Sequence, residues 1–363
     1  MNYIHKREAW PNFKWDDKSL VPVLAALHLR QGRFLGRMES LGVGLQKKAE
    51  LESLTLEAVK TSEIEGEILA ENKVRSSIAR RLGLDIAGLV PSDRRVDGVV
   101  DMTLDATRSF SEPLTPERLF RWHKALFPDA DNNLKIGAWR DDAKGPMQVV
   151  SGSLAEPRVH YVAPPAERLE REMARFLDWE NAADALDPVL KAGIAHLWFV
   201  LIHPFDDGNG RIARAIADRG LARSENSARR FYSMSAQIRQ ERNDYYKILE
   251  LTGKDGLDIT GWLNWFTTCL DHAFMGAETA VASALRKEKF WKEHGGAALN
   301  ARQSLILNRL LDGFEGKLTT VKWAKMAKCS HDTALRDIAD LIERGILLKD
   351  EGGGRSTSYS LKS

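Results

Sequence analysis

The sequence predicts a mainly α-helical protein, and three observations support this fold class. Apolar residues recur at helical spacing through most of the chain, for example between Leu20 and Met38. An almost uninterrupted apolar run over 189–202 fits a buried helix, because it contains Lys191 and His196 and is too short to cross a bilayer. Short β-prone runs stand out near 147–162 and 346–361. We therefore expect a helical core with two small hairpins.

Length and composition favour a soluble protein of two or three domains. The chain has 363 residues, of which 43% are hydrophobic and 29% are charged, and its net charge is +2. A charge so close to zero excludes a protein that binds nucleic acid as a polycation over its whole surface. Cys269 and Cys329 are too few for a disulfide framework, and no apolar signal core follows Met1. We expect a cytoplasmic protein with no membrane partner.

Residues 1–110 are predicted to form an N-terminal helical extension. Trp10, Phe13 and Trp15 indicate an arm that packs on a later helix. The helices expected after this arm cover 19–53 with a break at Gly42 and Gly44, then 51–59, 67–82 and 96–110.

Residues 111–275 are predicted to form the core of the protein. Thr115-Pro116 combines a capping residue with proline at the first helical position, so a helix begins there. The β-prone runs 147–152 and 158–162 bracket polar turn residues and predict a hairpin. Helices are expected over 166–179 and 189–202, and further helices continue to about 274.

The remaining residues are predicted to form a charged helical connector over 276–300 and a separate domain over 301–363. Helices are expected at 304–314, 320–327 and 330–344, the last capped by Ser330 and stopped by Gly345. A hairpin follows, with a glycine-rich tip at 351–355. Three helices with such a hairpin resemble a winged helix-turn-helix domain.

The stretch 203–214, His-Pro-Phe-Asp-Asp-Gly-Asn-Gly-Arg-Ile-Ala-Arg, carries the clearest chemistry. Gly208, Asn209 and Gly210 form a tight turn at a helix start, where successive N–H groups make an anion nest. Arg211 and Arg214 lie three residues apart, so they share one face and offer forked donors to phosphate oxygens. The pattern indicates a site for a phosphate-bearing substrate, although such a turn can also be a simple connection.

Two more residues of this stretch have roles that suit phosphate chemistry. Asp207 supplies the hard oxygen ligand that Mg²⁺ bridging phosphates requires. His203 titrates near neutrality and could take a proton from an attacking hydroxyl. A metal hydrolase built on His196 and His203 is the weaker interpretation, because no third ligand stands at a suitable spacing.

These residues match, at every defined position, the signature loop HxFx[D/E]GNGRxxR of the Fic (filamentation induced by cAMP) family, and 114–274 resembles the Fic core. The resemblance implies a protein adenylyltransferase that moves AMP from ATP to a Ser, Thr or Tyr hydroxyl of a target protein, with Mg²⁺. It also implies that His203 is the general base, that Asp207 holds Mg²⁺, that 208–211 cradle the α- and β-phosphates, and that Arg214 meets the γ-phosphate. Gly210 favours adenylyl transfer over the phosphotransferase branch typified by Doc, which has Lys there.

Two neighbouring segments resemble further parts of the family's site. The hairpin that contains Val149, Val150, Ser151 and Gly152 resembles the flap that would hold a target segment by β-augmentation, unless it is only a surface hairpin. Tyr245 and Tyr246 resemble the tyrosines that border the adenine pocket, although core packing is nearly as good an explanation.

The segment Thr61-Ser-Glu-Ile-Glu-Gly66 matches the family's inhibitory pattern [S/T]xxxE[G/N]. By this resemblance Glu65 pairs with Arg214 and neutralises the guanidinium that should hold the γ-phosphate. The alternative is that Glu63, Glu65 and Glu67 form a solvated acidic stripe. A homodimer that secures the inhibitory helix is expected from family habit.

Other functions stay open at this point. The C-terminal domain could make the protein a DNA-binding regulator, although 330–344 mixes Arg336 and Arg344 with the acids Asp332, Asp337, Asp340 and Glu343. Lys322, Lys325, Lys328 and Arg355 could meet DNA phosphates, and a role in protein docking or dimerisation is an equal alternative. Glu65 could also orient a water for removal of AMP, and the enzyme could modify itself.

Overall fold

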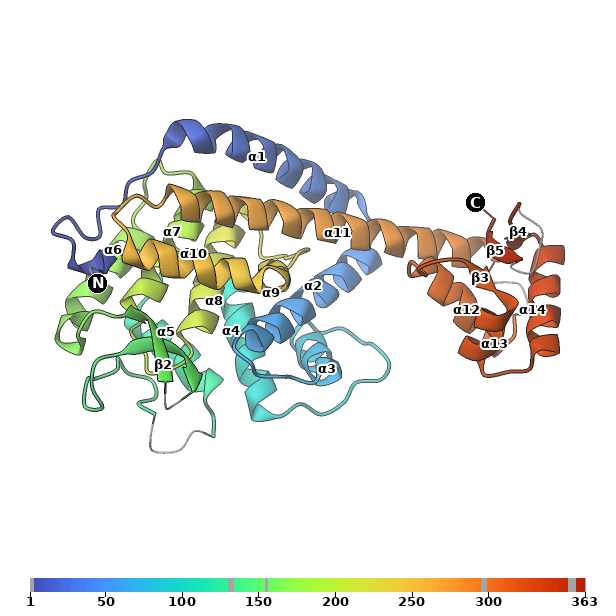
Figure 1. The fold of residues 1–363 in the computed structure, drawn as a ribbon, viewed down its shortest axis with the longest axis horizontal. Coiled ribbons are helices and arrows are strands. Elements are labelled where there is room, and N and C mark those ends of the chain that lie inside the picture. Colours follow the sequence, from blue (N-terminus) through green and yellow to red (C-terminus); the bar gives the residue numbers. More distant parts are fainter. Residues whose placement is uncertain (1–2, 130–133, 154–155, 295–298, 352–356, 363) are drawn as a thin grey trace. The chain divides into compact units, whose positions relative to one another are not determined.

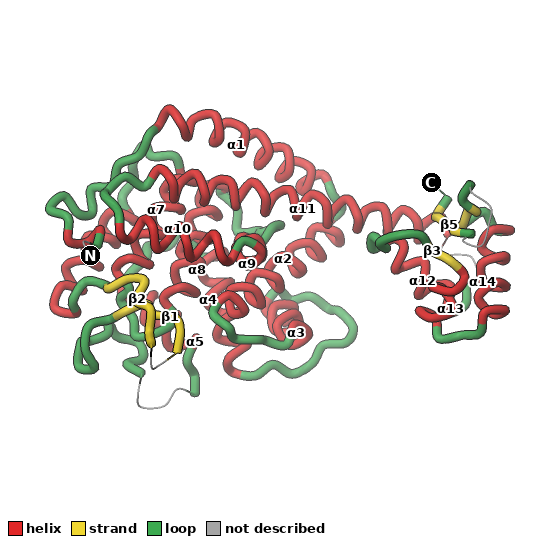
Figure 2. Tube along the Cα trace, viewed as in Figure 1, coloured by secondary structure: helices red, strands yellow, loops and turns green. Residues whose placement is uncertain are grey.

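The computed structural model describes residues 3–129, 134–153, 156–294, 299–351 and 357–362 (Figure 1). The chain divides into two compact units, Met1–Ala277 and Glu278–Ser363. Helices make up most of the described residues, and strands occur in only two small sheets (Figure 2). The predicted mainly α fold class is therefore confirmed. Among the described residues, no helix combines the length and apolar character needed to span a bilayer.

The first unit opens with an arm and four helices. The arm contains η1 (Ile4–Lys6), and its Trp10 and Phe13 lie edge-on to Trp198 of a later helix, as predicted. The helices are α1 (Asp17–Ser40), α2 (Val43–Ile64), α3 (Glu71–Arg81) and α4 (Arg94–Arg108). Phe34 of α1 contacts Phe274 of α11 (Thr260–His294), and these two helices run side by side in Figure 1.

Two details of these helices differ from the prediction. Gly44 does not break a helix, because it lies in the first turn of α2, where glycine weakens few backbone bonds. The helix expected from 67 begins only at Glu71, because Gly66 has φ +86° and turns the chain sharply after α2. As a result, 65–70 form a non-helical connection that reaches the site described below.

The rest of the first unit surrounds one buried helix. Its elements are α5 (Pro116–Leu126), β1 (Gln148–Ser153), β2 (Glu156–Val162), η2 (Ala166–Arg168), α6 (Leu169–Asn181), α7 (Pro188–Ile202), α8 (Asn209–Glu225), α9 (Met234–Gln240) and α10 (Arg242–Lys254), followed by α11. The apolar run is α7, and most of its side chains are buried. β1 and β2 pair antiparallel as predicted, with a bulge between Val149 and Val150.

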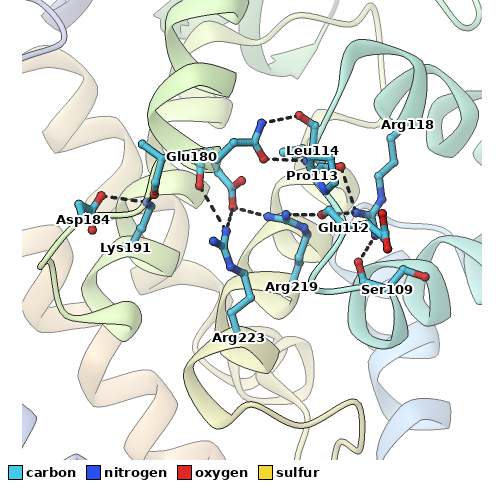
Figure 3. Close-up of polar contacts among 12 residues, drawn as sticks. Ser109, Glu112, Pro113, Leu114, Arg118, Glu180, Asp184, Lys191, Arg219 and Arg223 are labelled. Atoms are coloured by element: carbon cyan, nitrogen blue, oxygen red, sulfur yellow. Dashed lines mark hydrogen bonds and ion pairs between the residues drawn. The ribbon is translucent and has the colours of Figure 1, made fainter.

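Buried polar contacts fix α8 relative to its neighbours (Figure 3). The Arg219 guanidinium of α8 donates to Glu180 Oε1 of α6 at 2.5 Å and to the Glu112 carbonyl at 2.5 Å. Arg223, one turn further along, donates to the Glu180 carbonyl at 3.3 Å. Because α8 carries the residues of the 203–214 stretch at its other end, these contacts hold the site's helix in place.

The second unit packs α12 (Ala301–Leu311), α13 (Thr320–Ala327) and α14 (His331–Glu343) around a core that contains Trp323, Ile338 and Leu341. Its sheet has the order β3-β5-β4, formed by β3 (Leu318–Thr319), β4 (Leu347–Lys349) and β5 (Ser358–Leu361). The three helices and the β4–β5 pair agree with the prediction, whereas β3 was not predicted. The hairpin tip with Arg355 lies outside the described residues, and the winged-helix identity stays a prediction.

Candidate active site

The 203–214 stretch forms a tight loop between α7 and α8. His203 ends α7 with φ +51°, and Gly208 precedes α8 with φ +80°. Only a glycine suits position 208, because a Cβ there would lie 2.9 Å from a ring carbon of Phe127. The loop therefore brings the start of α8, with its exposed backbone N–H groups, next to His203.

The His203 imidazole is prepared to accept a proton. Its Nδ1 lies 3.2 Å from the Val200 carbonyl, which can only accept, so Nδ1 carries the hydrogen and Nε2 keeps its lone pair. Burial lowers the pKa of His203 to about 4, and the Arg140 charge acts in the same direction. The ring is therefore neutral at pH 7, as a general base requires.

Side chains of the loop and its neighbours fix the loop's shape. The Asn209 amide accepts from the Phe205 N–H at 3.0 Å and donates to the Phe205 carbonyl at 2.8 Å. His123 of α5 donates from Nε2 to the Asp207 carbonyl at 3.2 Å, since its Nδ1 accepts the Gly137 N–H at 3.0 Å. The Asn209 side chain thus shapes the loop.

Arg214 is held by the segment predicted to be inhibitory. Its Nη2 lies 2.8 Å from Glu65 Oε1, its Nε donates to Thr61 Oγ1 at 2.8 Å, and Nη2 also donates to the Thr61 carbonyl at 2.8 Å. Arg214 is 2% exposed, whereas the Glu65 side chain is 30% exposed. Burial alone would raise the pKa of Glu65, but the charge and the hydrogen bond of Arg214, together with smaller contributions from Arg211 and Tyr246, lower that pKa.

A second carboxylate of the same segment pairs with the other arginine. Glu67 Oε2 lies 2.7 Å from Nη1 of Arg211, and Arg211 is 5% exposed. Glu63 pairs with Arg239 at 2.9 Å and with Lys60 at 2.5 Å. The solvated-stripe alternative therefore does not hold, because each of these three acids has a cationic partner.

Both arginines keep an unused donor. Within the described part of the chain, Arg211 Nε and Arg214 Nη1 are buried and have no hydrogen-bond partner. A buried N–H without an acceptor costs about 1–3 kcal/mol, more when the group is charged. These two donors therefore fit a site that binds an anion larger than the carboxylates now present.

A cavity of about 640 Å³ adjoins His203, Gly210 and Glu65. Val149, Val150 and Ser151 of β1 line it, and Gly152 follows them in the same strand. The hairpin is therefore part of the cavity wall, as the flap prediction requires.

The two tyrosines of α10 have different surroundings. Tyr245 lines the cavity but is 1% exposed, and its hydroxyl lies 2.9 Å from His196 Nε2. Tyr246 is half-buried, and its hydroxyl lies 3.4 Å from Glu65 Oε2. Tyr245 is mainly a core residue, whereas Tyr246 touches both the cavity and the inhibitory segment.

The residues present offer an incomplete metal site. Asp207 is exposed, and its Oδ1 accepts the Gly208 N–H at 2.6 Å. Across the described ranges, no group of three or more His, Cys, Asp and Glu side chains is arranged to hold a metal ion. One carboxylate suits Mg²⁺ only when phosphate oxygens and water supply the other ligands.

Comparison with protein families places this loop in a known domain. Residues 113–221 match the description "Fic/DOC family", and residues 3–84 match "Domain of unknown function (DUF4172)". The chain is a Fic domain protein. The Fic domain covers α5 through the loop and into α8, which are the elements that carry His203, Arg211 and Arg214.

Curated relatives of this Fic protein are transferases by name. A uridine 5'-monophosphate transferase from Xanthomonas campestris is 35% identical over 31% of this chain and 21% of the relative. The protein adenylyltransferase Fic of Nematostella vectensis is 34% identical over 31% of this chain and 25% of the relative. That of Culex quinquefasciatus is 26% identical over 67% of this chain and 47% of the relative. The chain therefore spans less than half the length of these relatives.

Solved structures agree with this Fic fold. A Fic family protein from Desulfovibrio desulfuricans has a TM-score of 0.53 and 22% identity, over 94% of this chain and 96% of that one. A Fic domain containing signaling protein from Bacteroides thetaiotaomicron has a TM-score of 0.53 and 20% identity, over 70% and 96%. At these identities the likeness concerns the fold alone.

The structure brings most of the predicted Fic site residues together and adds others. His203, Gly210, Glu65 and the tyrosines share the cavity, while Arg211 and Arg214 begin α8 beside it. The residues whose roles were missed from the sequence are Glu67, His123 and Arg140, while Thr61 was known only as the first position of the inhibitory pattern. Glu67 could have been found, because it lies two residues after Glu65 in the same connection. No spacing in the sequence indicated His123 or Arg140.

Proposed function

We propose that this protein transfers AMP from ATP to a hydroxyl side chain of a target protein, and that its resting form is inhibited by its own N-terminal segment. The pairing of Glu65 with the buried Arg214, beside a neutral His203, carries the proposal. The Fic domain and the relatives named protein adenylyltransferase support it.

In the proposed reaction, the target hydroxyl attacks the α-phosphorus of ATP, the bond to the β-phosphate breaks, and pyrophosphate leaves. His203 Nε2 accepts the hydroxyl proton, and its Nδ1–H bond to Val200 fixes the ring for this role. The N–H groups at the start of α8, with the spare donors of Arg211 and Arg214, bind the phosphates. Mg²⁺ would neutralise phosphate charge, with Asp207 as its protein ligand.

Three features support AMP transfer to a docked target. A Cβ at position 210 would lie 2.1 Å from Glu65 Oε1 and 3.2 Å from Arg214 Nη1, so a larger residue there would compete with the contacts at this site. β1 of the flap lines the cavity and could pair with an extended target segment. Tyr246 and the flap border the space in the cavity that is left for the nucleobase of ATP.

Inhibition would follow because Arg211 and Arg214 are already paired with carboxylates of the N-terminal segment. Glu65 and Glu67 hold the two guanidinium groups that the phosphates need, so ATP must displace both carboxylates. Because Glu65 is partly exposed, we assign its pair about 1–2 kcal/mol, which corresponds to about 5- to 30-fold in ATP occupancy.

The test uses ATP labelled separately at the α- and γ-phosphates, with wild type, Glu65→Gly and His203→Ala, in lysate and with the purified protein alone. We expect α-label on protein with Glu65→Gly, about 5- to 30-fold less with wild type, and none with His203→Ala. UTP labelled at the α-phosphate tests which nucleobase the site accepts. Transfer of γ-label, or no transfer by Glu65→Gly, would contradict the proposal.

A second candidate function is DNA binding by the second unit. Asp337 of α14 pairs with Arg302 at 2.8 Å, and Asp340 Oδ2 accepts from Gln303 at 2.6 Å. Both acids therefore bond to residues of α12, so they repel DNA phosphates less than the sequence indicated. Lys322, Lys325, Lys328 and Arg336 are exposed.

A further inference from the structure

One buried arginine holds the main chain of the proposed base. His203 has φ +51°, a left-handed conformation that costs a residue with a side chain about 1–2 kcal/mol. Arg140 Nε donates to the His203 carbonyl at 2.8 Å, and the Arg140 N–H donates to the Pro204 carbonyl at 2.9 Å. The two contacts fix both peptide groups that follow the strained residue.

The same guanidinium reaches the end of the flap. Arg140 Nη2 donates to the Pro164 carbonyl at 2.5 Å, just after β2. Its Nη1 donates to Asp142 Oδ1 at 2.8 Å, and Asp142 Oδ2 accepts the Ala166 N–H at 2.7 Å. The Arg140 side chain is 0% exposed, and each of its three nitrogens has a partner.

We propose that Arg140 is a positioning residue for catalysis, which orients His203 toward the cavity and ties it to the flap that would hold the target. Arg140 touches no expected substrate atom, so it acts through His203. Lysine would keep the charge, but its three N–H donors share one nitrogen, so they could not reach the three separate acceptors that Arg140 contacts from Nε, Nη1 and Nη2. The proposal rests on the proposed function for its catalytic readout.

Arg118 provides a matched control. It is also buried, at 4% exposed, and its Nε donates to Asp105 Oδ2 at 2.8 Å. Its other nitrogens donate to main-chain carbonyls, including those of Glu112 at 2.9 Å and Ser109 at 2.9 Å. Arg118→Lys therefore removes a similar buried network at the join of α4 and α5, with no contact to His203.

The first measurement compares Arg140→Lys and Arg118→Lys in the Glu65→Gly background. For Arg140→Lys we expect kcat to fall at least about tenfold while the KM for ATP stays within about twofold, since a displaced base slows the reaction without weakening phosphate binding. For Arg118→Lys we expect a lower Tm with kcat within about twofold. Unchanged kcat in Arg140→Lys, or equal losses in both variants, would overturn the proposal.

The second measurement does not depend on activity. Nitrogen NMR of the His203 ring, assigned with His203→Gln, reports its tautomer. We expect a single Nδ1–H form in the Glu65→Gly parent and in Arg118→Lys, and a mixture in Arg140→Lys because the bond to Val200 loosens. A single Nδ1–H form in Arg140→Lys would refute the positioning role. Absence of AMP transfer in the parent would instead refute the proposed function and leave this result standing.

Discussion

At the scale of single residues, Glu67 forms an ion pair with Arg211, just as Glu65 forms one with Arg214. We predict that Glu67→Gln raises ATP affinity about two- to fivefold, because a pair whose carboxylate is 29% exposed is worth up to about 1 kcal/mol. The gain should persist in Glu65→Gly, since the second arginine is freed separately. Equilibrium binding of ATP checks this, with Glu63→Gln as control because Glu63 pairs with Arg239 and Lys60. Equal gains in both variants would argue against a role at the phosphates.

His203 determines the pH dependence at the same scale. Its pKa is lowered by burial to about 4 from an ordinary 6.5, so the base is lost only when pH falls toward 4. We predict that kcat/KM of Glu65→Gly shows no loss with a midpoint near 6.5 as pH falls from 8 to 5. Removing the Glu65 charge acts in the same direction, because that charge raises the pKa of His203. The prediction would be contradicted if kcat/KM fell with a midpoint near pH 6.5 while ATP binding, measured over the same pH range, showed no such midpoint.

Residues that share one loop could be predicted from the sequence, and residues that meet across the chain could not. His203, Gly208, Arg211 and Arg214 lie within twelve positions, so their spacing alone indicated a phosphate site. Arg140 bonds a carbonyl 63 positions away, and main-chain acceptors leave no pattern in the sequence. Asn209 was placed in this loop from the sequence, but the closing of the loop by its amide on Phe205 could not be predicted.

At the scale of elements, α2 acts through its docking on the core. Glu57 of α2 accepts from Ser233 Oγ at 2.7 Å and from the Ser235 N–H at 3.0 Å, at the start of α9. We predict that Glu57→Ala destabilises the protein by about 1–3 kcal/mol, because two buried donors lose their acceptor, and that it raises basal AMP transfer by loosening α2. Thermal unfolding and α-label transfer measure the two effects. Glu52→Ala, on the exposed face of the same helix, should change neither.

The helices themselves were largely predictable, and their ends were less so. Periodicity located α4, α5 and α7 because each buries one apolar face or is buried all round. Gly66 adopts the positive φ expected of a helix stop, but the gap that follows it was missed, because 67–70 were expected to be helical and α3 begins only at Glu71. That gap matters for function, since it lets Glu65 and Glu67 reach two arginines of α8.

At the scale of the whole molecule, the chain joins a unit that contains the Fic domain to a second compact unit. Figure 1 shows that α11 passes from one unit into the other, and Phe290 near its end belongs to the core of the second. The two compact units meet at Ala277 and Glu278. The functions of the two units can therefore be tested by variants confined to each.

For the second unit we predict weak, salt-dependent binding of duplex DNA through α13 and the start of α14. Lys325 and Lys328 are exposed there, and two acids of α14 are engaged by α12. Replacing both lysines by alanine should weaken binding of any sequence and reduce the slope of log affinity against log salt by about two, since each lysine would release one counterion. Lys289→Ala with Lys292→Ala removes the same charge from the exposed face of α11 and should leave the slope unchanged. Equal effects of the two pairs would mean that only net charge attracts DNA, and no binding at low salt would leave docking of a protein as the explanation for this unit.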